Sequence, residues 1–273
     1  MEKVISTNYQ KNKKSKVSLC NICLEEASLS WDHVPPKGGI KLTAVEQEPL
    51  LQYLRGSNDE RKYKISQNGV KYRTLCSKCN AKLGSYYDIS LNQFTLEIGK
   101  LLKSKIILPN KVDITTKPSH LVRSICGHLL AAKIKTEYTT IDVALRDFVF
   151  NESKQVPDNL KVFYWLYPYS STINIRDVAM LKVRGDFSGV GMFSLLKYFP
   201  IAFLITDCDK YEGLRELTSY CYGNVDDEVQ IPIDLRAPLK EYNWPEIVDE
   251  GNILLGGQSL HSGVFALPKG SKK

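Results

Sequence analysis

The chain lacks several features that would assign it to a broad class. No apolar run approaches the roughly 18 to 20 residues needed to cross a bilayer. The first 16 residues contain no apolar core and no small-residue cleavage site, so we expect no secretory signal there. No phosphate-binding loop and no internal repeat is present. From these absences we expect a cytoplasmic protein without a membrane partner, in which any energy-dependent step would need a partner protein.

Positive charge is concentrated in one part of the sequence. The 273 residues carry a formal charge of +7. Residues 1–100 contain 16 Lys and Arg against 10 Asp and Glu, whereas residues 101–273 contain 21 against 20. An excess of cations in one region is typical of a surface that meets a polyanion such as DNA. The alternative for the lysines among the first 16 residues is a solvated tail.

The order of expected elements predicts a mixed α+β protein. We expect a basic, disordered tail at 1–16, a small module at 17–105 and an α+β domain at 106–273. The expected elements are a short helix at 45–54, a strand at 70–75, a helix from residue 80 with a break near Gly84, a helix at 120–133, and strands at 161–169, 178–183 and 199–206.

Four of the seven cysteines form two C-x-x-C pairs, Cys20/Cys23 and Cys76/Cys79. This spacing lets two thiolates reach one ion from a tight turn, and two such pairs complete a tetrahedral structural zinc site. A redox role is possible for either pair alone. The other cysteines lack this spacing and are expected to be buried core residues. A closed four-cysteine site has no open position for water, so the zinc itself performs no chemistry.

Residue types suited to phosphodiester hydrolysis lie between and just after the cysteine pairs. The first group is Asp32-His33, followed by Pro35-Pro36, and the second is Asn80, directly after Cys79. An imidazole can act as a base at neutral pH. Carboxylate and amide oxygens are ligands that Mg²⁺ accepts.

Taken together, these motifs resemble the HNH, or ββα-metal, endonuclease family in its cysteine-bearing branch. The resemblance covers about residues 17–90. It implies a metal-dependent endonuclease acting on DNA, with His33 as general base and with Asp32 and Asn80 as ligands of a catalytic Mg²⁺ or Mn²⁺. The resemblance also implies a role in restriction or phage defence. Residues 106–273 would then form a homodimer, bind a regulatory partner or recognise DNA. Phosphate contacts are predicted for three lysines, Lys37, Lys78 and Lys82.

The sequence departs from the family pattern in two places. Lys71 and Tyr72 stand where many members carry a middle asparagine, and the nearest asparagine is Asn68. The separation between His33 and Cys76 also exceeds what is usual for the family, which predicts an excursion at about 42–64.

Several alternative interpretations remain open. A zinc-ribbon module that binds nucleic acid or protein without catalysis is the rival function. Asn80 is alternatively interpreted as the N-cap of a helix, because asparagine is a favoured N-cap residue. We expect His120 and His128, on the apolar helix, to be structural, and Asp88 is a possible further carboxylate.

Overall fold

The computed structural model describes residues 11–54, 63–182, 189–208, 211, 213–246, 252–255 and 262–271. The first part of the chain forms a three-stranded antiparallel sheet in the order β1 (Val17–Leu19), β2 (Glu26–His33) and β5 (Lys71–Cys76). Directly after β5 follows helix α2 (Ser77–Lys82). β2, β5 and α2 therefore form a ββα unit.

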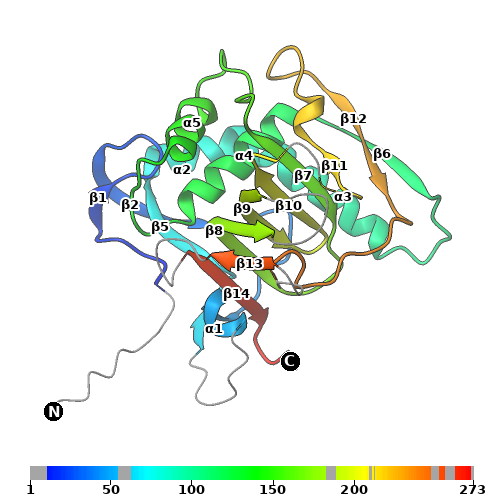
Figure 1. Cartoon of the computed structure of the whole chain (residues 1–273), viewed down its shortest axis with the longest axis horizontal. Helices are drawn as coiled ribbons and strands as arrows, with labels where there is room; N and C mark the ends of the chain where they lie inside the picture. Colours follow the sequence, from blue (N-terminus) through cyan, green and yellow to red (C-terminus); the bar gives the residue numbers. More distant parts are fainter. Residues whose placement is uncertain are drawn as a thin grey trace.

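A nine-stranded antiparallel sheet occupies the middle of the molecule, and its strand order is β11-β7-β10-β9-β8-β14-β3-β4, with β13 paired to β8. The strands are β3 (Val45–Pro49), β4 (Lys64–Ser66), β7 (Lys161–Leu166), β8 (Thr172–Lys182), β9 (Gly189–Tyr198), β10 (Ile201–Thr206), β11 (Arg215–Glu216), β13 (Asn252–Leu255) and β14 (Gly263–Pro268). A separate ribbon pairs β6 (Lys111–Thr116) with β12 (Val229–Asp234). It lies on the opposite side of the molecule from β1, β2 and β5 (Figure 1).

The helices are α1 (Leu50–Leu54), the π-helix η1 (Leu83–Tyr87), α3 (Asp88–Leu102), α4 (Pro118–Ala131), α5 (Thr140–Val149) and the short 3₁₀ helix η2 (Thr218–Tyr220). Together with the strands they confirm the predicted mixed α+β class. No helix among the described residues is long and apolar enough to span a membrane.

Helix α4 is the central element of the fold (Figure 1). It is buried on nearly all sides and contacts η1, α3, α5, β2, β5 and β9. Burial on nearly all faces places α4 in the core, where its polar side chains need partners. Gly127 brings α4 close to η1, because a Cβ at this position would lie 2.5 Å from a methyl group of Leu83. The neighbouring His128 is thereby carried into the centre of the molecule.

The expected excursion between His33 and Cys76 joins the large sheet. Residues 45–54 were expected to be a helix, but only 50–54 are helical, and Val45–Pro49 forms β3. β3 pairs with β14, more than 200 residues later in the chain. A single cluster of buried hydrophobic residues also contains residues from both predicted parts, from Cys20 to Ala266. The predicted division near residue 105 therefore passes through a shared sheet and a shared core.

Candidate metal centre and active site

The four cysteines of the two C-x-x-C pairs converge in the structure. Cys20 and Cys23 lie in the turn between β1 and β2, Cys76 ends β5, and Cys79 lies in the first turn of α2. Backbone N–H groups point at the sulfurs: Cys76 N donates to Cys20 Sγ at 3.3 Å, and Cys79 N donates to Cys76 Sγ at 3.4 Å. The turns that hold the two C-x-x-C pairs thus orient the four cysteine side chains toward one point.

The spacing of the sulfurs fits a tetrahedral metal ion. The four Sγ atoms lie 3.6–3.9 Å apart. Four thiolates bound to zinc at about 2.3 Å in a tetrahedron are separated from each other by about 3.8 Å. The four cysteines can therefore hold a metal such as zinc, and the predicted cluster is confirmed to this extent. None of the seven cysteines forms a disulfide in the structure.

The environment of Cys20 favours the thiolate, which is the form that binds metals. A hydrogen bond from the Cys79 thiol and bonds from backbone N–H groups lower the pKa of Cys20 to about 4, although burial opposes the shift. Three of the four sulfurs are buried and Cys23 is exposed. The site is closed on its inner side and tied to the ββα unit.

A second cluster of acidic side chains is already neutralised by protein cations. Carboxylates of Glu137, Asp142 and Asp177 lie within 4.8 Å of one another. The Lys133 ammonium forms ion pairs with all three, and Arg176 pairs with Asp142 at 2.8 Å. We interpret this cluster as a buried ion-pair network.

The pairing of β2 with β5 places Asp32 and His33 on opposite faces of the sheet. Asp32 lies opposite Tyr72, which is buried, and His33 lies opposite Lys71 at the partly exposed face. Successive side chains on a strand point to opposite sides. The structure therefore separates the Asp32 carboxylate from the His33 imidazole.

His33 is half-buried at the end of β2. Burial lowers its pKa below the ordinary 6.5, and the positive charges of Lys71 and Lys37 lower it further, while the Asp32 charge opposes them. The lowered pKa favours the neutral imidazole, which is the form that a general base needs.

Asp32 is committed to a buried polar triad with His128 and Asp88. His128 Nδ1 lies 2.9 Å from an oxygen of Asp32, and Nε2 lies 2.9 Å from an oxygen of Asp88. Ser124 Oγ donates to the same Asp88 oxygen at 2.6 Å. His128 is fully buried, which agrees with the structural role expected for it. Sequence reasoning missed these partners. The available signal was a histidine on a largely apolar helix, because a buried imidazole requires polar partners.

The structure gives Asn80 a role other than capping. Its Nδ2 donates to Ser30 Oγ and to the Trp31 carbonyl oxygen, both at 2.9 Å. The N-cap of α2 is Cys76, whose sulfur accepts from Cys79 N, so the capping alternative for Asn80 is wrong. Asn80 joins α2 to β2 next to His33.

Asp32 and Asn80, the predicted ligands of a divalent ion, each have protein partners in the structure. One Asp32 oxygen is bonded to His128, and the side chain is 5% exposed. The Asn80 amide is held by β2. Among the described residues, no group of three or more His, Cys, Asp or Glu ligand atoms includes Asp32 or His33. Asn80 bonds to β2 through its Nδ2, whereas a metal would bind its oxygen, so the site expected for Mg²⁺ or Mn²⁺ stays a prediction.

The three lysines predicted to contact phosphate, Lys37, Lys78 and Lys82, are all exposed. Lys82 lies 4.8 Å above the Phe150 ring, which directs it toward the end of α5. The candidate middle asparagine, Asn68, has a φ of 61° in the turn between β4 and β5. Asparagine tolerates this left-handed conformation, so the turn accounts for Asn68.

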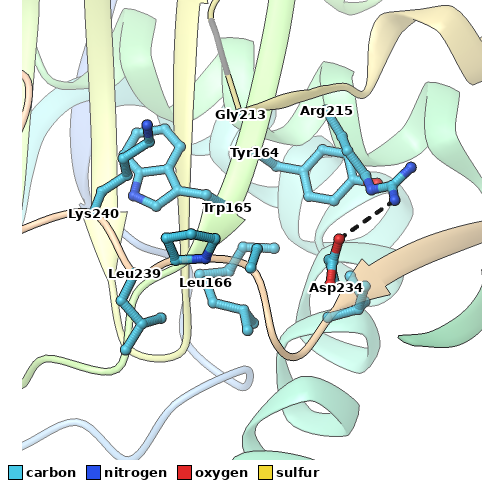
Figure 2. Close-up of a pocket in the computed structure, with 12 residues that line it drawn as sticks. Tyr164, Trp165, Leu166, Gly213, Arg215, Asp234, Leu239 and Lys240 are labelled. Atoms are coloured by element: carbon cyan, nitrogen blue, oxygen red, sulfur yellow. Dashed lines mark ion pairs between the residues drawn. The ribbon is translucent and has the colours of Figure 1, made fainter. Parts of the chain in front are cut away.

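A small cavity lies elsewhere, against β7 and β10. Its volume is about 60 Å³, less than the roughly 150 Å³ of a cavity that holds one benzene molecule. Trp165, Leu239 and Lys240 line one end, and Arg215 pairs with Asp234 at the other (Figure 2). None of the predicted site residues lines this cavity.

Comparison with known proteins gives no relative: no family model, no curated protein and no solved structure matches the chain. Identification with the HNH family therefore stays a prediction based on the motifs.

Proposed function

We propose that the protein is an endonuclease that hydrolyses phosphodiester bonds in DNA, with His33 as the general base. The observation that carries the proposal is the surface of the ββα unit beside the cysteine cluster. There a neutral imidazole lies across from Lys71, and Asn80 fixes the backbone of the strand that bears it.

The chemistry assigned to these residues is a single displacement. His33 takes a proton from a water molecule, whose oxygen forms the new bond to phosphorus. The bond from phosphorus to the 3′ oxygen breaks, and solvent supplies the proton that this oxygen takes up. Lys71 and Lys37 stabilise the negative charge that builds on the phosphate. No step is assigned to a bound metal ion.

A role in restriction or phage defence rests on the family resemblance. Location in the cytoplasm and a regulatory or homodimeric contact through residues 106–273 are further parts of the proposal, which do not rest on that resemblance. The proposed metal at the four cysteines is a structural zinc ion, which stabilises the unit and takes no part in the reaction.

The second candidate is a zinc-clamped binding module without catalysis. It is favoured by the buried Asp32–His128–Asp88 triad, because this triad explains Asp32 without reference to substrate. In that case the face formed by β2 and β5 would bind nucleic acid or protein but would not catalyse a reaction.

Cleavage and binding assays on the same preparation distinguish the two candidates. Zinc-loaded protein is incubated with plasmid and with circular single-stranded DNA, with and without Mg²⁺ or Mn²⁺. The proposal predicts nicked or linear products that depend on protein concentration. Retained DNA binding with no product under any of these conditions would support the binding module and contradict the nuclease.

A further inference from the structure

An exposed tryptophan lies beside His33 on the face of the ββα unit. The Trp31 side chain is 43% exposed, whereas Trp165 is 9% exposed and packs against Trp244. A tryptophan at the surface offers a large, rigid aromatic face to a ligand. Asn80 holds the backbone of this tryptophan through its carbonyl oxygen.

A β-bulge in β5 places Arg73 next to the tryptophan ring. Ser30 pairs with Leu75 and Asp32 with Tyr72, so two residues of β5 lie opposite Trp31 alone. The backbone of the bulged Arg73 pairs instead with the segment at 12–14: its N–H donates to Asn12 O, and its carbonyl accepts from Lys14 N. Residues 11–16, expected to belong to the tail, thus run beside β5, while residues 1–10 lie outside the described part of the chain.

Cations surround the ring and are not neutralised by carboxylates. Lys71 Nζ lies 5.6 Å and Arg73 Cζ 5.5 Å from the ring centroid. In the part of the chain that the structure describes, no ion pair joins Lys37, Lys71 or Arg73 to a carboxylate. Arg73 Nη2 donates to the Lys14 carbonyl oxygen at 2.8 Å, which holds the guanidinium beside the ring. Lys13, bridged to Arg73, is exposed beside them.

An aromatic ring among unpaired cations is complementary to an unpaired base on a phosphate backbone. Bases stack on exposed aromatic side chains irrespective of sequence, and the neighbouring cations follow the phosphates. Base pairs in a duplex are already stacked on each other, so their faces are not available to Trp31. The cation–π contacts within the sheet account for the position of the cations but leave the ring exposed.

We propose that Trp31 is a stacking platform for single-stranded nucleic acid, with Lys71, Arg73 and Lys13 as its phosphate contacts. This inference rests on the proposed function, because it names the form of substrate presented to His33. The strand lies across β2 and β5 with one unpaired base on the indole ring.

Binding of oligo(dT) and oligo(U), compared with a duplex of the same length, tests the proposal without reference to cleavage. The measurements use His33→Ala protein without added Mg²⁺ or Mn²⁺, so that no substrate is consumed. We expect single strands to bind more tightly than the duplex, and Trp31→Ala to weaken that binding about tenfold. Trp31→Phe should restore most of it. Tyr222→Ala, at a 75% exposed aromatic in another part of the fold, is the matched control and should bind like the parent.

Intrinsic fluorescence gives a second readout of stacking. Oligo(dT) should quench the tryptophan emission of the parent protein, and Trp31→Phe should remove the quenching. Equal binding by Trp31→Ala and its parent, or equal affinity for duplex and single strand, would overturn the proposal. If Trp31-dependent binding is found but wild-type protein never cleaves, the stacking proposal stands and the nuclease proposal fails.

Discussion

Replacing His128 with alanine should destabilise the protein strongly, because the imidazole lies between two buried carboxylates. It is fully buried and bonded at 2.9 Å to both Asp32 and Asp88. Removing it leaves both carboxylates without their shared partner in the core. The substitution also opens a cavity beside Gly127, where α4 already contacts Leu83 closely.

The expected magnitude follows from the cost of breaking a buried ion pair. Removing one partner costs about 3–5 kcal/mol, because the remaining charge stays buried without compensation. For a protein of this size, each kcal/mol corresponds to roughly 2–4 °C in melting temperature. His128→Ala should therefore melt roughly 6–20 °C below the wild type.

The effect should depend on pH with a defined sign. Burial alone would lower the pKa of His128, but the charges and hydrogen bonds of Asp32 and Asp88 raise it well above 6.5. A group whose pKa is raised by folding stabilises the protein fully below its unfolded pKa, and this stabilisation is lost as pH rises through the folded value. The difference in melting temperature between the wild type and His128→Ala should thus shrink as the pH rises into the alkaline range.

Differential scanning fluorimetry of zinc-loaded protein between about pH 6 and 10 measures both quantities. His33→Ala is the matched control, because it removes the same side chain from a partly exposed position and should change stability by about 0.5 kcal/mol or less. Equal melting temperatures for His128→Ala and His33→Ala would refute the reasoning about the triad.

Three further predictions concern the metal site and its surroundings. Elemental analysis should find one zinc per chain, which Cys79→Ser should lower and Cys126→Ser, at a buried cysteine outside the cluster, should not; substoichiometric zinc in fresh wild-type protein would contradict the site. Asn80→Ala removes two hydrogen bonds and should cost about 1–3 kcal/mol in urea unfolding, whereas an unchanged midpoint would show that Asn80 does not hold β2. Lys13→Ala should reduce the salt dependence of single-strand binding by about 0.7 in the logarithmic slope, and an unchanged slope would mean that Lys13 is only solvated.

Local features of the fold were predictable from the sequence. The cysteine pairs converge as expected, because a C-x-x-C turn fixes the geometry of two ligands within a few residues. The helix break predicted near Gly84 coincides with the π-helix Leu83–Tyr87. The strand at 70–75 and the helix at 120–133 match β5 and α4 closely, since their apolar patterns have the correct periods.

Features that depend on distant parts of the chain were not predictable in the same way. Val45–Pro49 is a strand because β14 pairs with it, and no local pattern indicates that partner. Asp32 and His128 are separated by 96 residues, so no motif links them. The sequence predicts Asp32 as a metal ligand, and the structure pairs one of its oxygens with His128. Only the tertiary structure reveals this second partner.

The role of His33 as the general base of a nuclease is tested by single-turnover cleavage of plasmid and of circular single-stranded DNA. Zinc-loaded wild type and His33→Ala are compared at pH 7 with Mg²⁺ or Mn²⁺, after equal zinc content and melting temperature have been verified. We expect His33→Ala to lower the rate about 10²–10⁴-fold on the DNA that the wild type cleaves. Equal rates for the two proteins would contradict it.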